Sequence, residues 1–228
     1  MQPTFLPWLG YFSLIDSVDK FVFLDVVQFE SRSWQQRNRI LINSEARWLT
    51  VPTTLPSGRS TLINQVLINK EHYSGLSLLK TLKQAYGNKP GFEYIEMSLF
   101  QAILSPPDQL SLLNVGLITK IAQSLGSNTV FISASDLNVS GSKADLLLDI
   151  SKTLGATTYV SPLGSRVYLD EYSGFSDSGI SLEYQNFNHP TYPQGQDTFI
   201  SHLSVIDAIC NTNLDATRDL IHEGSNLE

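Results

Sequence analysis

The chain has 228 residues, of which 42% are hydrophobic and 16% charged, which is the composition of a folded globular protein and not of a disordered one. Its formal net charge of -7 and its pI near 5.0 exclude a general polyanion-binding surface, so we do not expect nucleic acid as a partner. A single cysteine excludes a disulfide framework, and no apolar run approaches the ~20 residues that span a bilayer, so we expect a cytoplasmic protein with no membrane span.

The N-terminal part of the chain is dense in special residues. Residues 2–12 combine two prolines, a glycine and four aromatic side chains, and we expect the prolines to fix the chain as it enters one or two helical turns over residues 13–18. The run 21–29 is almost continuously β-branched or aromatic, which predicts a strand buried on both faces. Residues 47–52 predict a further strand that ends at its proline.

The middle of the chain has a helical pattern. Apolar residues recur every three or four positions from Lys70 to a stop at Gly87, and again from Pro106 to Gly126. This periodicity predicts a mainly helical subregion over about residues 70–126.

The third quarter of the chain predicts a β-α-β unit. Residues 129–133 are strand-like, residues 142–154 helix-like and residues 157–161 strand-like again. Because a crossover helix joins parallel strands, we expect these two strands to be neighbours or near-neighbours in one sheet. Residues 180–187 alternate like an antiparallel or edge strand, and residues 199–211 predict a closing helix.

An arginine cluster is the strongest local anomaly. Arg32, Arg37 and Arg39 lie within eight residues of an acidic chain, with only Glu30 as an acidic neighbour. Guanidinium groups hold carboxylate or phosphate through paired hydrogen bonds, so this segment, which also holds Trp34, is a candidate anion site. The alternative is that these arginines only form ion pairs at the protein surface.

Two further places offer polar side chains that could carry chemistry. Asp25 and Gln28 follow the predicted strand, at the sheet edge where α/β proteins hold ligands, although Asp25 could instead cap the next turn. His189 lies in a loop with two prolines and is the best candidate for a general base. The histidines lack metal-ligand spacing, so we predict no metal site, and the sequence assigns no cofactor.

Segments along essentially the whole chain carry motifs that occur in this order in one known family. They are Gln2–Phe12, Phe21–Phe29, Trp34–Ile40, Trp48–Pro52, Leu154–Ala156, Tyr159–Gly164, and the residues His189, Pro190, Tyr192, Gln194, Phe199, Leu203 and Ser204. With these motifs the chain resembles the WbqC-like protein family. Members occur among genes for bacterial O-antigen and other surface polysaccharides, and a glycine transferase role is suggested for some.

The resemblance also implies a fold. It implies a single WbqC-like domain over residues 1–228, and relatives usually carry a short apolar strand before the Gln-Pro pair, so we expect that strand either to be truncated or to be absent from the sheet. A weaker similarity to pantoate-activating ligases, without their HxGH element, implies a Rossmann-like sheet. The expected fold class is therefore α/β, with a mostly parallel Rossmann-like sheet flanked by helices and a helical middle segment.

The family resemblance implies amide formation on an amino sugar. We hypothesise an N-acyltransferase, similar to a glycine transferase, whose partners are a small activated sugar and an acyl or aminoacyl donor that is free or carrier-bound. His189 or Asp25 would remove the amine proton. The predicted substrate-binding residues are Gln2, Trp8, Tyr11, Gln28, Trp34, Arg37, Asn38, Arg39, Tyr192 and Gln194. The alternatives are a non-catalytic protein that binds a nucleotide sugar or a partner enzyme, and an ATP-dependent amide ligase.

Overall fold

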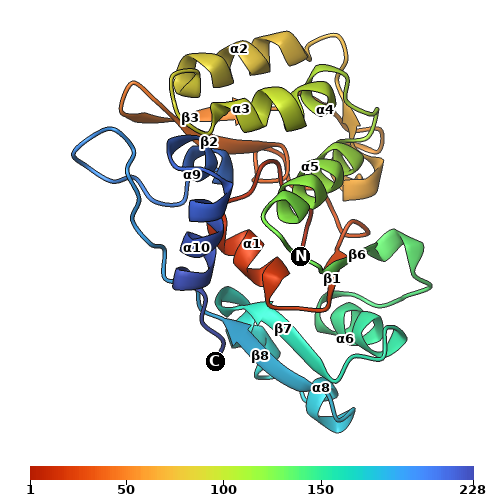
Figure 1. The fold of residues 1–228 in the computed structure, drawn as a ribbon. Coiled ribbons are helices and arrows are strands. Elements are labelled where there is room, and N and C mark those ends of the chain that lie inside the picture. The colour runs from red at the N-terminus through yellow and green to blue at the C-terminus, as the bar shows by residue number, and fades with distance from the viewer.

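The computed structural model describes residues 1–228 and shows a mixed α/β fold (Figure 1). The strands are β1 (Lys20–Phe23), β2 (Arg37–Ile42), β3 (Glu45–Thr50), β4 (Thr53–Thr54), β5 (Leu67–Ile68), β6 (Val130–Ser133), β7 (Thr158–Pro162) and β8 (Ser181–Gln185). The helices are α1 (Leu9–Asp16), α2 (Gly75–Tyr86), α3 (Phe92–Tyr94), α4 (Phe100–Leu104), α5 (Leu110–Ser124), α6 (Lys143–Thr153), α7 (Arg166–Leu169), α8 (Gly174–Asp177), α9 (Val205–Asn211) and α10 (Leu214–Gly224).

The strands form four two-stranded sheets. The pairs β1–β6 and β7–β8 are parallel, and the pairs β2–β3 and β4–β5 are antiparallel. The predicted β-α-β unit is present as β6, α6 and β7, but the expectation that its two strands share one sheet is wrong, because β6 pairs with β1 whereas β7 pairs with β8. A continuous Rossmann-like sheet is therefore not formed.

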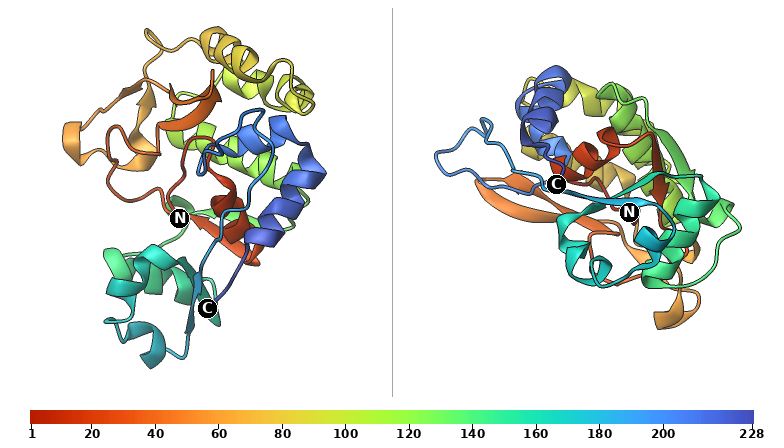
Figure 2. Two further views of the ribbon diagram at one scale, coloured as in Figure 1. Left: turned by 90° about the vertical axis from the view of Figure 1, so that its left-hand side faces the viewer. Right: turned by 90° about the horizontal axis from the view of Figure 1, so that it is seen from below.

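The largest part of the core surrounds α1. Every residue of this helix except Asp16 is buried, as expected for a helix that is apolar on all sides. A cluster of 37 buried hydrophobic residues joins α1 to β1, β2, α2, α5, α9 and α10. A smaller cluster joins α6 and α8 to β7 and β8, and this part projects from the rest of the molecule in Figure 2.

Several predicted elements are confirmed with corrected ends. The helical middle segment contains α2, which is capped by Gly87, and α5, and a π-helical turn over Ile95–Leu99 separates α3 from α4. The strand predicted over residues 21–29 stops at Phe23, because the next residues turn and the Asp25 side chain bonds Ser135. The strand β8 pairs in parallel with β7 and makes an antiparallel bridge from Gln185 to Leu227 on its other side, so the prediction of an antiparallel or edge strand is correct only in part. None of the helices is long and apolar enough to cross a bilayer.

Candidate functional site

The hairpin formed by β2 and β3 presents two arginines on one face. Side chains alternate along a strand, so Arg37 and Arg39 share the less buried face of β2. The guanidinium carbon of Arg37 lies 4.1 Å from the centroid of the Trp48 ring, and that of Arg39 lies 5.8 Å from the Trp34 ring. The two indoles contact each other with centroids 5.2 Å apart. The face is thus a cationic surface with aromatic walls.

Neither arginine has an acidic partner. None of the ion pairs of the chain includes Arg37 or Arg39, and the Nε atom of each is buried without a hydrogen-bond acceptor. Buried donors normally find a partner, because leaving one unpaired costs free energy. No carboxylate of the chain lies within ion-pairing distance of either guanidinium group.

A cluster of rings adjoins the arginines. The Trp8 ring stacks on His202 with centroids 4.7 Å apart and on His189 at 6.0 Å, and the two imidazoles are 5.1 Å apart. The backbone N–H of Ser204 donates to the carbonyl of Arg39 at 2.9 Å, which fixes the loop that carries both histidines against β2. Burial, and then the charge of Arg39, lower the pKa of His202.

The His189 imidazole is set up to accept a proton. Its Nδ1 lies 2.8 Å from the carbonyl oxygen of Pro190, and because a carbonyl can only accept, Nδ1 carries the hydrogen. The lone pair is then on Nε2, which is buried and has no partner. Burial lowers the pKa of His189 below its usual value, so the ring is neutral at pH 7.

The local backbone that places Trp8 is fixed by β2. The side-chain amide of Asn38 donates to the carbonyls of Phe5 and Leu6 at 3.2 and 2.7 Å, and Leu6 has a left-handed φ of 44°. A bulky residue adopts this conformation only when its surroundings hold it there. His202, whose ring stacks on Trp8, has a similar φ of 58°.

Gly10 makes room for the Trp8 side chain. A Cβ atom on Gly10 would lie 2.4 Å from the Trp8 ring, which is closer than real carbon contacts. The indole therefore lies directly on the first turn of α1, at the position immediately before the helix begins.

Some predicted site residues have roles outside this cluster. Asp25 is buried, and its two oxygens accept hydrogen bonds from the backbone N–H and the hydroxyl of Ser135 at 2.9 and 2.6 Å. Gln28 is exposed and donates to the carbonyl of Arg59 at 2.7 Å. No contact joins either residue to His189.

The remaining predicted residues hold backbone or other side chains. Buried Tyr11 donates to the carbonyl of Gln2 at 2.9 Å, and the side-chain oxygen of Gln2 accepts from Gln35 at 2.8 Å. Tyr192 and Gln194 both donate to Asp207, each at 2.9 Å. Of the predicted set, the structure thus places Trp34 with Arg37 and Arg39, and Trp8 with His189, whose ring also stacks with that of Tyr192 at 6.3 Å.

Comparison with known proteins gives the chain a family. A model of the WbqC-like protein family matches residues 2–219. The chain belongs to the WbqC-like protein family. An uncharacterized protein of Mycobacterium tuberculosis is 28% identical to this WbqC-like chain over 225 residues, which cover 95% of this chain and 94% of that protein. No solved structure matches it.

Two residues of the WbqC-like site were missed from sequence. Trp48 lies opposite Arg39 in the β2–β3 register, and a hairpin predicted from the turn residues Asn43 and Ser44 would have placed it there. His202 was not among the predicted site residues, and no local signal indicates its stacking on Trp8. No group of three or more His, Cys, Asp or Glu side chains could hold a metal ion.

Proposed function

We propose that this WbqC-like protein binds a small anionic substrate between Arg37 and Arg39 and transfers an acyl or aminoacyl group to an amine, with His189 as general base. One observation carries the proposal: the Nε atoms of both arginines and Nε2 of His189 lack hydrogen-bond partners, and Ser204, at the end of the loop that carries His189, bonds the carbonyl of Arg39. Unpaired donors and an unpaired acceptor in the same cluster suit a ligand that has both an anion and an acidic proton.

The anion of the substrate would be a phosphate or a carboxylate. Guanidinium groups bind both through paired hydrogen bonds, and two arginines suit a diphosphate such as that of a nucleotide-linked sugar. The faces of Trp34 and Trp48, which are 45% and 47% exposed, are available for stacking on a sugar or a base. These features support an activated amino sugar as the substrate.

The chemical step would be amide formation. As the amine nitrogen attacks the carbonyl carbon of the donor, Nε2 of His189 takes the amine proton, the new C–N bond forms, and the bond to the leaving group breaks with its electron pair on the leaving group. An ammonium has no lone pair, so a neutral base is required. The lowered pKa of His189 supports this role.

We also propose a biosynthetic role, a cellular compartment and a fold relationship for the protein. Family membership supports a role in bacterial surface polysaccharide synthesis, including O-antigen, and a glycyl donor. The buried free thiol of Cys210 supports a reducing compartment, which is the cytoplasm. The two parallel strand pairs support the proposal that the fold is related to Rossmann-like sheets.

Mass analysis of reaction products tests the function. The protein is incubated with an amino sugar nucleotide and either a carrier-bound acyl donor or glycine with ATP. A mass gain with the carrier-bound donor supports acyl transfer, and a gain only with glycine and ATP identifies an amide ligase.

The His189→Gln variant separates catalysis from binding. It should lower the rate about 100-fold or more, because a positioned general base contributes ~10²–10⁴-fold. Ligand binding without any turnover would favour the second candidate, a non-catalytic binding protein, which the exposed indoles and arginines also fit.

A further inference from the structure

The outer edge of the β2–β3 hairpin is not bonded by any other part of the chain. The strand β3 pairs only with β2, and no isolated bridge reaches it. Four of its six residues are exposed, namely Glu45, Arg47, Trp48 and Thr50. A strand edge of this kind presents free backbone N–H and C=O groups, and it readily pairs with another strand.

The free backbone groups belong to alternate residues of β3. On β2, the N–H of Leu41 and the carbonyl of Arg39 bond segments outside the hairpin, at 3.0 and 2.9 Å. Ala46 and Trp48 lie opposite these two residues in the register. In an antiparallel pair, opposed residues that do not bond each other both direct their backbone groups outward. The outward groups of β3 are therefore those of Ala46, Trp48 and, by alternation, Thr50.

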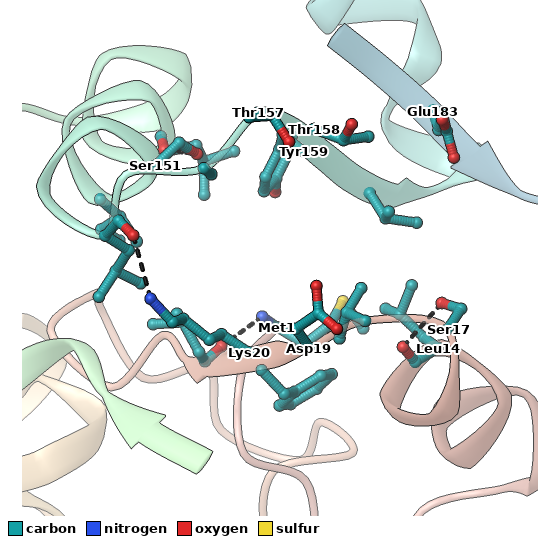
Figure 3. Close-up of a pocket in the computed structure, with 18 of the residues that line it drawn as sticks. Met1, Leu14, Ser17, Asp19, Lys20, Ser151, Thr157, Thr158, Tyr159 and Glu183 are labelled. Atoms are coloured by element: carbon teal, nitrogen blue, oxygen red, sulfur yellow. Dashed lines mark hydrogen bonds between the residues drawn. The ribbon is translucent and has the colours of Figure 1, made fainter. Parts of the chain in front are cut away.

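Other strand edges are covered by the chain itself. Gln185 at the end of β8 forms a bridge with Leu227 on the side away from β7. The strands β1 and β7 face each other across a cavity of about 400 Å³, which Lys20 and Tyr159 line from its two sides (Figure 3). The free edge of β3 differs from these edges because it faces solvent.

The side chains beside this edge favour an acidic partner. Trp48 lies opposite Arg39, and Arg37 is on the same face of the hairpin. The Arg37 guanidinium carbon lies 4.1 Å from the centroid of the Trp48 ring, so its charge is next to the outer strand. Neither arginine forms an ion pair, whereas Arg47 on the other face pairs with Glu45. Carboxylates on the Trp48 face of an added strand would balance this charge.

We infer that the outer edge of β3 is a docking edge for an extended acidic segment of another protein, which pairs antiparallel with β3 as a third strand of the hairpin sheet. Alternate residues of the segment exchange hydrogen bonds with Ala46, Trp48 and Thr50. These residues carry the carboxylates, because opposed residues in a sheet share a face, and this face is that of Arg37. The inference does not depend on the proposed function, because it requires the backbone of β3 and no turnover.

A second copy of the chain fits this edge less well. An antiparallel pair of two β3 strands would place the arginine faces of both copies on the same side of one sheet, where like charges repel. Each copy also has a formal net charge of -7. Charge complementarity therefore favours an acidic segment whose own body is a different protein.

Blocked peptides of six residues, the length of β3, test the inference on the unmodified chain by isothermal titration. One peptide alternates glutamate and threonine, and its control has lysine in place of glutamate. The acidic peptide should bind about tenfold or more tightly than the basic one. N-methylation of its glutamates, whose N–H groups bond β3, should weaken binding about tenfold or more, whereas N-methylation of its threonines should change it less than about threefold.

A variant of the edge gives a second measurement. Thr50→Pro removes one outward N–H and no bond to β2, so it should weaken the acidic peptide about tenfold or more. If this variant does not fold, the peptide series on the unmodified chain still decides the question.

Four results would overturn the inference. They are no binding of the acidic peptide up to about 1 mM, equal binding of the acidic and basic peptides, equal losses from the two N-methylations, and a folded Thr50→Pro variant of unchanged affinity. Dimerisation of the chain that excludes the acidic peptide from β3 would also overturn it, because a second copy would then be the partner. None of these measurements needs turnover, so they are unaffected if the proposed function is wrong.

Discussion

Two polar clusters include residues of the loop 186–204, and they differ in how their hydrogen bonds are used. In the first, Asp207 is fully buried and accepts from the hydroxyls of Tyr86 and Tyr192 at 2.8 and 2.9 Å, and from Gln194 at 2.9 Å. Burial raises the pKa of this carboxyl in spite of its three donors. Its partners come from α2 and from the loop, so the cluster ties both to α9.

The second cluster contains Arg37, Arg39 and His189, and it lacks the hydrogen-bond partners that Asp207 has in the first. Its Nε and Nε2 atoms are buried without partners, and none of its charges is balanced. A polar group with all of its partners in the chain stabilises the fold, whereas a buried group without partners lowers stability and is available to a ligand. The four predictions that follow test this distinction.

The largest effect should come from the Asp207→Ala variant. It leaves the buried hydroxyls of Tyr86 and Tyr192 without an acceptor, while Nε2 of Gln194 keeps the carbonyl of Ile200, so we expect the free energy of unfolding to fall by about 3 kcal/mol. Denaturation in urea measures the loss. The control is Asp219→Ala on the exposed face of α10, which should change stability by less than about 0.5 kcal/mol. A loss as small as that of the control would contradict a structural role for the cluster.

A substitution of Asp25 should also act on stability. Both oxygens of this carboxylate bond Ser135, so Asp25→Ala should lower the free energy of unfolding by about 1–3 kcal/mol. A double-mutant cycle with Ser135→Ala measures how much of the loss belongs to this pair. If Asp25→Ala kept its stability but lost its activity, the result would contradict a structural role for this carboxylate. It would support Asp25 as the general base.

The Arg39→Gln variant should act on binding. We expect ligand affinity to fall about tenfold or more, which corresponds to ~1.4 kcal/mol, while the Tm stays equal or rises. The matched control is Arg47→Gln, on the same hairpin, whose exposed guanidinium pairs with Glu45. Isothermal titration with a nucleotide-linked amino sugar measures both, and equal losses in the two variants would show that the effect is not specific to the site.

The smallest effect should be a shift in the pH profile. His189 acts as a base only when it is neutral, so activity should be full at neutral pH and fall as the pH drops through its lowered pKa. The charge of His202 also lowers that pKa, after burial, so His202→Gln should move the midpoint of the profile to higher pH. A midpoint that stays in place would show that the two rings are not coupled.

Local sequence patterns predicted much of the fold. The periodicity of residues 110–124 and the stop at Gly87 follow from rules that act within one helix, and both are confirmed. The pairing of β6 with β1 and of β7 with β8 joins segments far apart in the sequence, and no local pattern determines it. The β-α-β unit was therefore found, while the sheet to which each strand belongs was not.

In the candidate site too, local sequence patterns did not predict contacts between distant segments. The arginine cluster was visible because charge of one sign was concentrated in an acidic chain, and the structure places Arg37 and Arg39 together with Trp8 and His189. The stacking of His202 depends on left-handed backbone at that residue, which nothing in the local sequence indicates, so tertiary contacts decide it. Asn38 could not be recognised as a backbone support because its acceptors lie 32 and 33 residues away.

The glycine at the start of α1 has a consequence for the position of a residue outside the helix. Because Gly10 has no side chain, the indole of Trp8 can lie against the helix, and the addition of one methyl group there would displace the ring. The stacking of Trp8 on His189 and His202 therefore depends on a residue that has no side chain.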